Sequence, residues 1–239
     1  MKNSDELMLP PNSKEAYRQD LLRQSKIAST VEEREELRQK MADLFVASAA
    51  PIDAELAGLD FPSIGKLSNS KVNYESAIPI LIKWLPLVET NDVKSAILGA
   101  LAVKWAKPTA AAPLIEFFQH LDSASAQELR WSVGNALECT ADDSVLDDII
   151  SIASNQCYGT DRQMFVMALG NMKDPKAVDV LINLLDDPEV LPGAVAGLAK
   201  AAAPKSRRHL EPLLHHSNHW ISKQAKKAIA KINKKYPQN

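Results

Sequence analysis

Two interleaved series of residue pairs recur through the last two thirds of this chain, and they restrict its possible folds more than any other feature. The first series joins two large apolar residues every 32 to 35 positions: Leu81-Ile82, Leu114-Ile115, Ile149-Ile150, Leu181-Ile182 and Leu213-Leu214. The second joins a small and a large residue every 30 to 36 positions: Ala100-Leu101, Ala136-Leu137, Ala168-Leu169, Leu198-Ala199 and Ala228-Ile229. A shared period of this length is typical of stacked two-helix units, because one unit cannot bury its apolar face alone.

The segment from Phe165 to Lys200 shows one such unit most clearly. Its first apolar residues have the spacing of one helical face: Phe165, Ala168, Leu169 and Met172. Asp174 is placed to cap the next helix, and Pro175 suits its first position, where a missing N–H costs nothing. Asp187-Pro188 repeats this turn signal, and we expect the following helix to begin at Pro192.

The run ALGNMKDPKAVDVLINLLDDPEV resembles HEAT repeats, in the short form shared with phycobilisome-lyase-like proteins. The runs NDVKSAILGALAVKWAKPTAAAPLIEFF and HWISKQAKKAIAKI are similar, so the resemblance covers roughly residues 74–236. It implies an all-α fold, a right-handed α-solenoid (HEAT-like superhelix) of about five helical hairpins with an N-terminal helical cap. Because this superhelix serves many binding roles, it does not by itself specify a function.

The pattern before the repeats predicts a different organisation. We expect a flexible tail over residues 1–12, an N-terminal helical cap and connector over 13–73, and the HEAT-repeat array over 74–239, forming one continuous domain with the cap. Thr30 and Glu33 have the spacing of a capping box, and Pro51 is expected to end the helix that follows.

The composition favours a helical fold and a reducing compartment. Hydrophobic residues make up 46% of the chain but aromatic residues only 5%, which favours helices packed through alanine and leucine over a sheet. Cys139 and Cys157 are too few for a disulfide framework and are expected to be buried, reduced core residues. No run approaches the ~18 apolar residues of a membrane span. We therefore expect a bacterial-type cytoplasmic protein that does not contact a membrane.

The motifs of common enzymes are missing from the sequence. It contains no Gly-rich phosphate loop and no G-x-S-x-G, and it lacks the His-Glu dipeptides that the HEAT-like deoxyhypusine hydroxylases use to hold two iron ions. The histidines between His209 and His219 lack further ligands for zinc. The sequence therefore predicts no catalytic residue, no cofactor and no metal, and favours a non-enzymatic protein.

The tryptophans and the basic C-terminus suggest nucleic acid as an alternative partner. Trp84, Trp105, Trp131 and Trp220 follow the repeat and are expected mostly to pack in the core or at a groove edge, with Trp131, beside Arg130, as the best functional exception. Residues 205–239 hold nine lysines and arginines but one acid, Glu211. Since no aromatic residues interleave with the lysines of the last helix, a solubilising end cap is favoured over a nucleic-acid contact there.

The candidate partner-binding residues follow from the resemblance, in which the second helix of each repeat lines the inner curve. The polar positions beside the bulky pairs would then form a strip in a concave groove: Lys83, Glu116, Gln119, Asp147, Ser151, Asp179, Asn183 and Glu211. Trp131 and Arg162 are added as further candidates, the latter as part of the non-repeating turn Tyr158–Arg162. The strip is acidic in its middle, which suits a basic peptide or protein and repels phosphate.

We therefore expect a non-enzymatic HEAT-repeat scaffold or adaptor that binds a protein or peptide partner in this groove. Two alternatives stay open at this point: a DNA-binding or alkylpurine-glycosylase-like HEAT protein, and a toxin-immunity protein.

Overall fold

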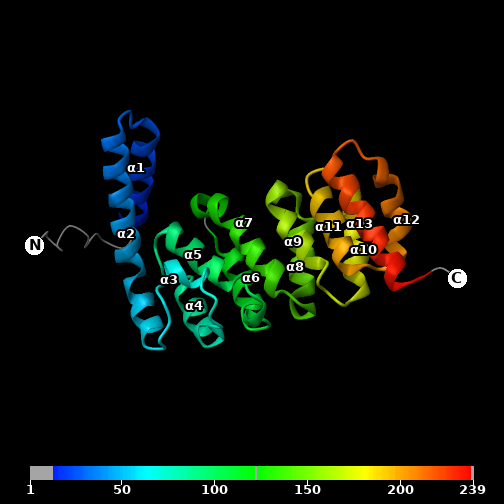
Figure 1. Cartoon of the computed structure of the whole chain (residues 1–239), viewed down its shortest axis with the longest axis horizontal. Helices are drawn as coiled ribbons and strands as arrows, with labels where there is room; N and C mark the ends of the chain where they lie inside the picture. Colours follow the sequence, from blue (N-terminus) through cyan, green and yellow to red (C-terminus); the bar gives the residue numbers. More distant parts are fainter. Residues whose placement is uncertain (1–12, 122, 238–239) are drawn as a thin grey trace, which may run out of the picture. The chain divides into compact units, whose positions relative to one another are not determined.

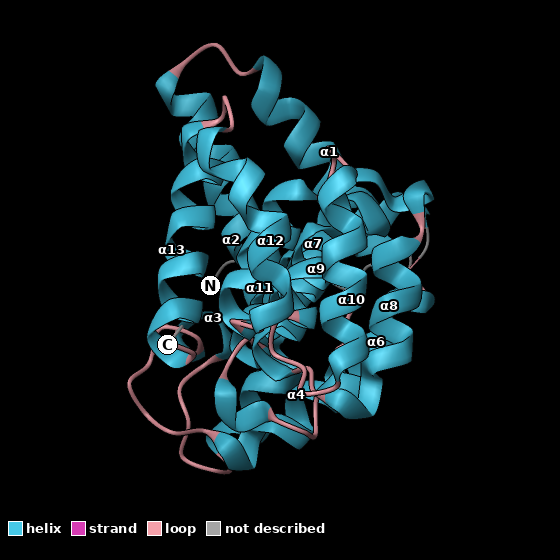
Figure 2. Ribbon diagram, turned by 90° about the vertical axis from the view of Figure 1, so that its right-hand side faces the viewer, coloured by secondary structure: helices cyan, strands magenta, loops and turns pink. Residues whose placement is uncertain are grey.

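The computed structural model describes residues 13–121 and 123–237, and every regular element in these ranges is a helix (Figures 1 and 2). The predicted all-α fold is confirmed. The tail expected over residues 1–12 lies outside the described residues. The described chain packs as two compact units. Unit 1 holds the residues up to Leu101 together with Ser123–Leu129, and unit 2 holds the rest. The predicted boundary between cap and array stays a prediction.

Unit 1 is built on a long helical hairpin followed by short helices. Its elements are α1 (Ser13–Ile27), α2 (Val31–Ala57), α3 (Ile64–Leu67), the 3₁₀ turn η2 (Glu75–Ala77), α4 (Ile78–Trp84), α5 (Asn91–Leu101) and the first residues of α7 (Ser123–Thr140). Helix α1 packs along α2 through the buried side chains of Leu21, Leu37 and Leu44.

Helix α2 begins where the sequence indicates and ends later. The Thr30 hydroxyl accepts a hydrogen bond from the Glu33 N–H at 3.1 Å, and the Glu33 carboxylate accepts one from the Thr30 N–H at 3.1 Å, so the predicted capping box is confirmed. The predicted end at Pro51 is wrong, since the helix continues to Ala57. A proline removes one helical hydrogen bond, but Ile52 and Leu56 beyond it are fully buried and offset that cost.

A buried arginine holds the start of α1 against α5 and the first part of α7. The Arg18 guanidinium forms ion pairs with Asp92 at 2.7 Å, Glu15 at 2.9 Å and Glu128 at 3.1 Å. Burial lowers the pKa of Arg18, but the hydrogen bond and charge of Asp92 and the charges of the two glutamates outweigh it, so the pKa is raised overall. Asn91 joins the cluster by donating from its backbone N–H to Glu15 and from its amide to Glu128.

This cluster predicts that unit 1 loses stability in acid. Burial raises the pKa of Glu128, but hydrogen bonds from Asn91 and Gln19 and the charge of Arg18 lower it by more. A depressed folded-state pKa stabilises the protein above the ordinary glutamate pKa, and that contribution is lost as pH falls through the folded value. The melting temperature should therefore fall between pH 6 and pH 3 (about the range of carboxylate titration) less steeply in Glu128→Gln than in the parent. If calorimetry showed the same dependence of melting temperature on pH in the variant and the parent, Glu128 would not have this stabilising role.

Unit 2 is an ordered stack of helical pairs. Its elements, besides the rest of α7, are η3 (Lys104–Ala106), α6 (Ala111–Gln119), η4 (Asp143–Val145), α8 (Leu146–Ser154), η5 (Gln156–Arg162), α9 (Gln163–Leu169), α10 (Pro175–Asn183), η6 (Leu184–Asp186), α11 (Leu191–Ala201), η7 (Pro204–Ser206), α12 (Arg207–Leu210), η8 (Glu211–His215) and α13 (His219–Lys235). Helix α9 packs against α11, α11 packs against α13, and α8 contacts α10 (Figure 1). Helices α9, α11 and α13 therefore form one layer of the stack, and α8 and α10 lie in the other.

The turns of unit 2 use the capping residues that the sequence indicates. The Asp174 carboxylate accepts a hydrogen bond from the Lys176 N–H at 2.8 Å, and Pro175 is the first residue of α10. Helix α11 begins at Leu191, one residue before the expected Pro192. In α13, the Asn218 side chain caps the first turn. The predicted helix–turn–helix unit from Phe165 to Lys200 is confirmed in this form.

Candidate partner-binding surface

Seven of the predicted partner-binding residues lie exposed on the even-numbered helices of unit 2. Glu116 and Gln119 lie on α6, Asp147 and Ser151 on α8, Asp179 and Asn183 on α10, and Glu211 on η8. We refer to these seven residues as the strip. Lys83 belongs to unit 1, where its ammonium pairs with Glu55 at 2.6 Å and lies 5.3 Å from the Trp84 ring centroid. The strip and Lys83 are therefore described separately.

Lysines from the following repeat pair with the acids of the strip. The Lys176 ammonium lies 2.5 Å from the Asp147 carboxylate, and the Lys205 ammonium lies 2.6 Å from that of Asp179. The hydrogen bond and charge of Asp147 raise the pKa of Lys176. Glu211 pairs with Arg207 at 3.2 Å. The negative charges of Asp147, Asp179 and Glu211 are therefore partly compensated by basic side chains beside the strip, while the strip itself holds only acidic charges.

These ion pairs leave both charges accessible to a partner. The side chains of Asp147 and Asp179 are 85% and 62% exposed. Exposed pairs of this kind typically contribute about 0.2–1 kcal/mol. A partner can therefore replace either ion pair at a small cost in free energy. It would supply a cation to the carboxylate and an anion to the displaced lysine.

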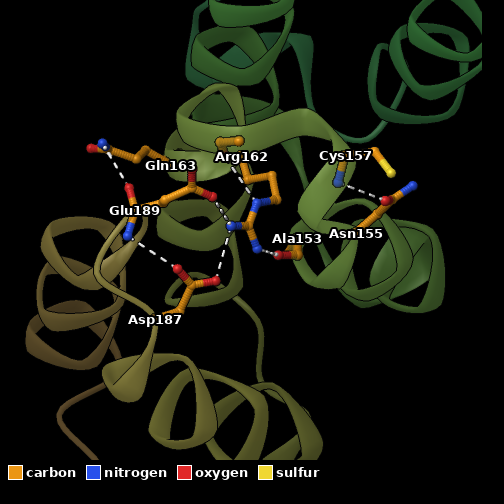
Figure 3. Close-up of polar contacts among 8 residues, drawn as sticks. Ala153, Asn155, Cys157, Arg162, Gln163, Asp187 and Glu189 are labelled. Carbon is orange, nitrogen blue, oxygen red and sulfur yellow. Dashed lines mark hydrogen bonds and ion pairs between the residues drawn. The ribbon is translucent and has the colours of Figure 1, made fainter.

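Arg162 is buried, and its side chain holds three segments of unit 2 together (Figure 3). Its guanidinium donates to the Ala153 carbonyl at 3.1 Å and to the carboxylates of Asp187 and Glu189, both at 2.9 Å. Its Nε donates to the Gly159 carbonyl at 2.9 Å. Because the side chain is 0% exposed, it is not available to a partner in this structure. Arg162 joins α8, η5 and the turn before α11.

A family model described as HEAT repeats matches residues 146–230, the segment from the start of α8 into α13. This segment of the chain therefore contains HEAT repeats. The match identifies the type of repeat but does not identify a subfamily. No curated protein matches the sequence.

Two of the solved structures that the chain resembles are designed proteins. One is a designed armadillo repeat protein that is 15% identical, with a TM-score of 0.45 over 90% of this chain and 99% of that protein. The other is a designed armadillo repeat protein in complex with peptide (KR)4, which is 16% identical, with a TM-score of 0.47 over 90% of this chain and 98% of that protein.

A second group of side chains lies half-buried at the η5 turn. The Arg130 guanidinium lies 5.1 Å from the Tyr158 ring centroid and 3.4 Å from Asp161. The Tyr158 ring packs edge-on against Phe118, with centroids 5.2 Å apart. Trp131, next to Arg130 on α7, is 57% exposed. Trp131 is therefore available to a partner, at a place distinct from the strip.

The other candidates from the sequence have mixed outcomes. Cys157 is exposed and Cys139 is half-buried, so the expected burial of Cys157 is wrong; burial raises the pKa of the Cys139 thiol. Trp220 is 45% exposed and does not pack in the core, whereas Trp84 and Trp105 are half-buried. Within residues 13–121 and 123–237, no three His, Cys, Asp or Glu side chains converge as metal ligands. None of the helices in that part of the chain combines the length and hydropathy of a membrane span.

Proposed function

We propose that this HEAT-repeat protein is a non-enzymatic scaffold that binds a protein or peptide partner along the strip of unit 2. The observation that carries the proposal is the continuation of exposed polar residues across α6, α8, α10 and η8, with lysines beside two of their carboxylates. Such a surface complements a partner whose own side chains alternate in charge. It opposes a uniform polyanion, because Glu116, Asp147, Asp179 and Glu211 would all face the phosphates.

Photo-crosslinking in the native host tests whether a partner contacts this strip. A photoreactive amino acid is placed at Ser151 or at Asn183, which are both exposed and carry no charge, and in a matched variant at Thr160 in η5. We expect one discrete cross-linked polypeptide from both strip positions, identifiable by mass spectrometry. No adduct from either position would overturn the proposal. An adduct from Thr160 alone would place the partner at the η5 turn and overturn the assignment to the strip.

Charge reversal on the strip should weaken binding while leaving the fold intact. With the partner identified in this way, Asp147→Lys combined with Asp179→Lys should weaken its affinity at least tenfold (about 1.4 kcal/mol or more) in calorimetric titration. The melting temperature should change little, because exposed ion pairs contribute only about 0.2–1 kcal/mol each. Asp20→Lys with Asp43→Lys makes the same net charge change on α1 and α2 of unit 1 and is the control. Equal loss of affinity in the control would show that net charge alone is responsible.

A further inference from the structure

Helix α13 presents an uncompensated positive face. Its apolar residues Ile221, Ala225, Ala228 and Ile232 are buried in unit 2. Its sequence holds six lysines and no acidic residue. Among the described residues, no carboxylate pairs with a lysine of α13, whereas Lys176 and Lys205, beside the strip, both pair with carboxylates of it. This charge is therefore available to an external anion.

Four of these lysines form one straight row, and an exposed tryptophan begins it. Trp220 is followed at steps of three, four, four and three residues by Lys223, Lys227, Lys231 and Lys234. On an α-helix these steps keep all five side chains on one face, over roughly 21 Å at 1.5 Å per residue. Trp220 is 45% exposed. We call these five residues the lysine row.

One lysine of the row is fixed in place by the end of the neighbouring helix. The Lys231 ammonium donates to the carbonyls of Ala199 at 3.0 Å and Lys200 at 2.8 Å, in the last turn of α11. A cation there satisfies carbonyl groups that the helix end leaves without partners. The contact anchors α13 to α11 while Lys223, Lys227 and Lys234 remain exposed to solvent.

We propose that the lysine row binds single-stranded nucleic acid, with the three exposed lysines contacting phosphates and Trp220 stacking on a base. An aromatic ring beside a track of cations is the arrangement that binds single strands without sequence preference. A membrane surface fits less well, because an interfacial helix inserts its apolar face and that face of α13 is already buried. The sequence-based expectation of a purely solubilising end cap leaves out Trp220, whose exposure becomes evident only in the structure.

Fluorescence anisotropy with the full chain and a labelled oligo(dT) or oligo(U) of ~20 nucleotides tests the proposal. We expect binding that weakens as salt increases. The triple variant Lys223→Gln, Lys227→Gln, Lys234→Gln should bind at least tenfold more weakly, and its slope of log K against log salt should be smaller by about 2, at ~0.7 for each phosphate that is no longer neutralised. Lys231 is kept because it supports the fold. Lys26→Gln, Lys66→Gln, Lys71→Gln removes the same charge from exposed positions of unit 1 and should retain full affinity.

Trp220 provides a second, independent readout. Trp220→Leu should weaken binding by roughly 5- to 100-fold, the range for loss of one stacked base, and should remove the quenching of tryptophan fluorescence by oligo(dT). Circular dichroism of each variant checks that α13 is retained. Absence of oligonucleotide binding at about 50 mM salt would overturn the proposal. So would equal losses in the two triple variants, or binding to phosphatidylserine vesicles that Trp220→Leu leaves unchanged while oligonucleotide binding is absent.

Discussion

The Arg162→Ala variant is expected to lose about 3–5 kcal/mol of unfolding free energy, the range for breaking a buried ion pair by removing one partner. The guanidinium is 0% exposed, and the Asp187 side chain facing it is only 16% exposed. Without the arginine, the Asp187 Oδ2 atom and the Ala153 carbonyl lose their hydrogen-bond donors in a place that water reaches poorly. Leaving such groups unpaired costs more than the hydrogen bonds themselves contribute. Urea denaturation followed by circular dichroism measures the loss.

Arg130→Ala is the matched control because Arg130 occupies the equivalent position one repeat earlier, 32 residues before Arg162. Its side chain is 28% exposed, and its one ion pair, to Asp161, is 3.4 Å long. We expect a loss of about 1 kcal/mol or less, including its contact with the Tyr158 ring. Equal losses in the two variants would contradict the structural role of Arg162. Asp187→Asn combined with Arg162→Met should recover part of the loss, since it also removes the stranded charge.

The contrast between these two arginines shows what the sequence could not reveal about the site. The sequence suggests a recognition role for Arg162 because it closes a polar turn, but its two carboxylate partners lie 25 and 27 residues further along the chain. The sequence hides the lysine partners of the strip acids for the same reason, since Lys176 and Lys205 follow Asp147 and Asp179 by 29 and 26 residues. A search for opposite charges in successive repeats would have identified these ion pairs.

The fold, in contrast, depends on local signals that the sequence displays directly. The capping contacts of Thr30 and Asp174 lie within three residues of their partners, and both form as expected. The apolar period places Leu181 and Ala168 in the core, where both are fully buried. Pro51 is the exception, because burial of residues after it outweighs a local rule. Tertiary burial, rather than helix propensity, determines where α2 ends.

A close approach of α9 to α11 in unit 2 predicts the second large effect, that of Gly170→Ala. A Cβ atom added to Gly170 would lie 2.4 Å from the Gly197 carbonyl oxygen and 2.6 Å from the Gly197 Cα. Both atoms belong to the backbone of α11, so no side-chain rotation relieves the clash, and α9 must move away from α11. We expect a loss near the upper end of the roughly 1–3 kcal/mol typical of overpacking. Urea denaturation measures it, and hydrogen exchange should show faster opening of α9 and α11.

Gly99→Ala makes the same chemical change where the neighbouring space is empty. Gly99 lies inside α5 with no atom within 4 Å of its added Cβ. We expect a gain of about 0.5–1 kcal/mol, because alanine loses less backbone entropy than glycine on entering a helix. Opposite signs in the two variants would show that α9 and α11 touch through their backbones, whereas a neutral Gly170→Ala would contradict that contact. The alanine series in the sequence indicates close helix packing, but at this point even an alanine side chain is too large.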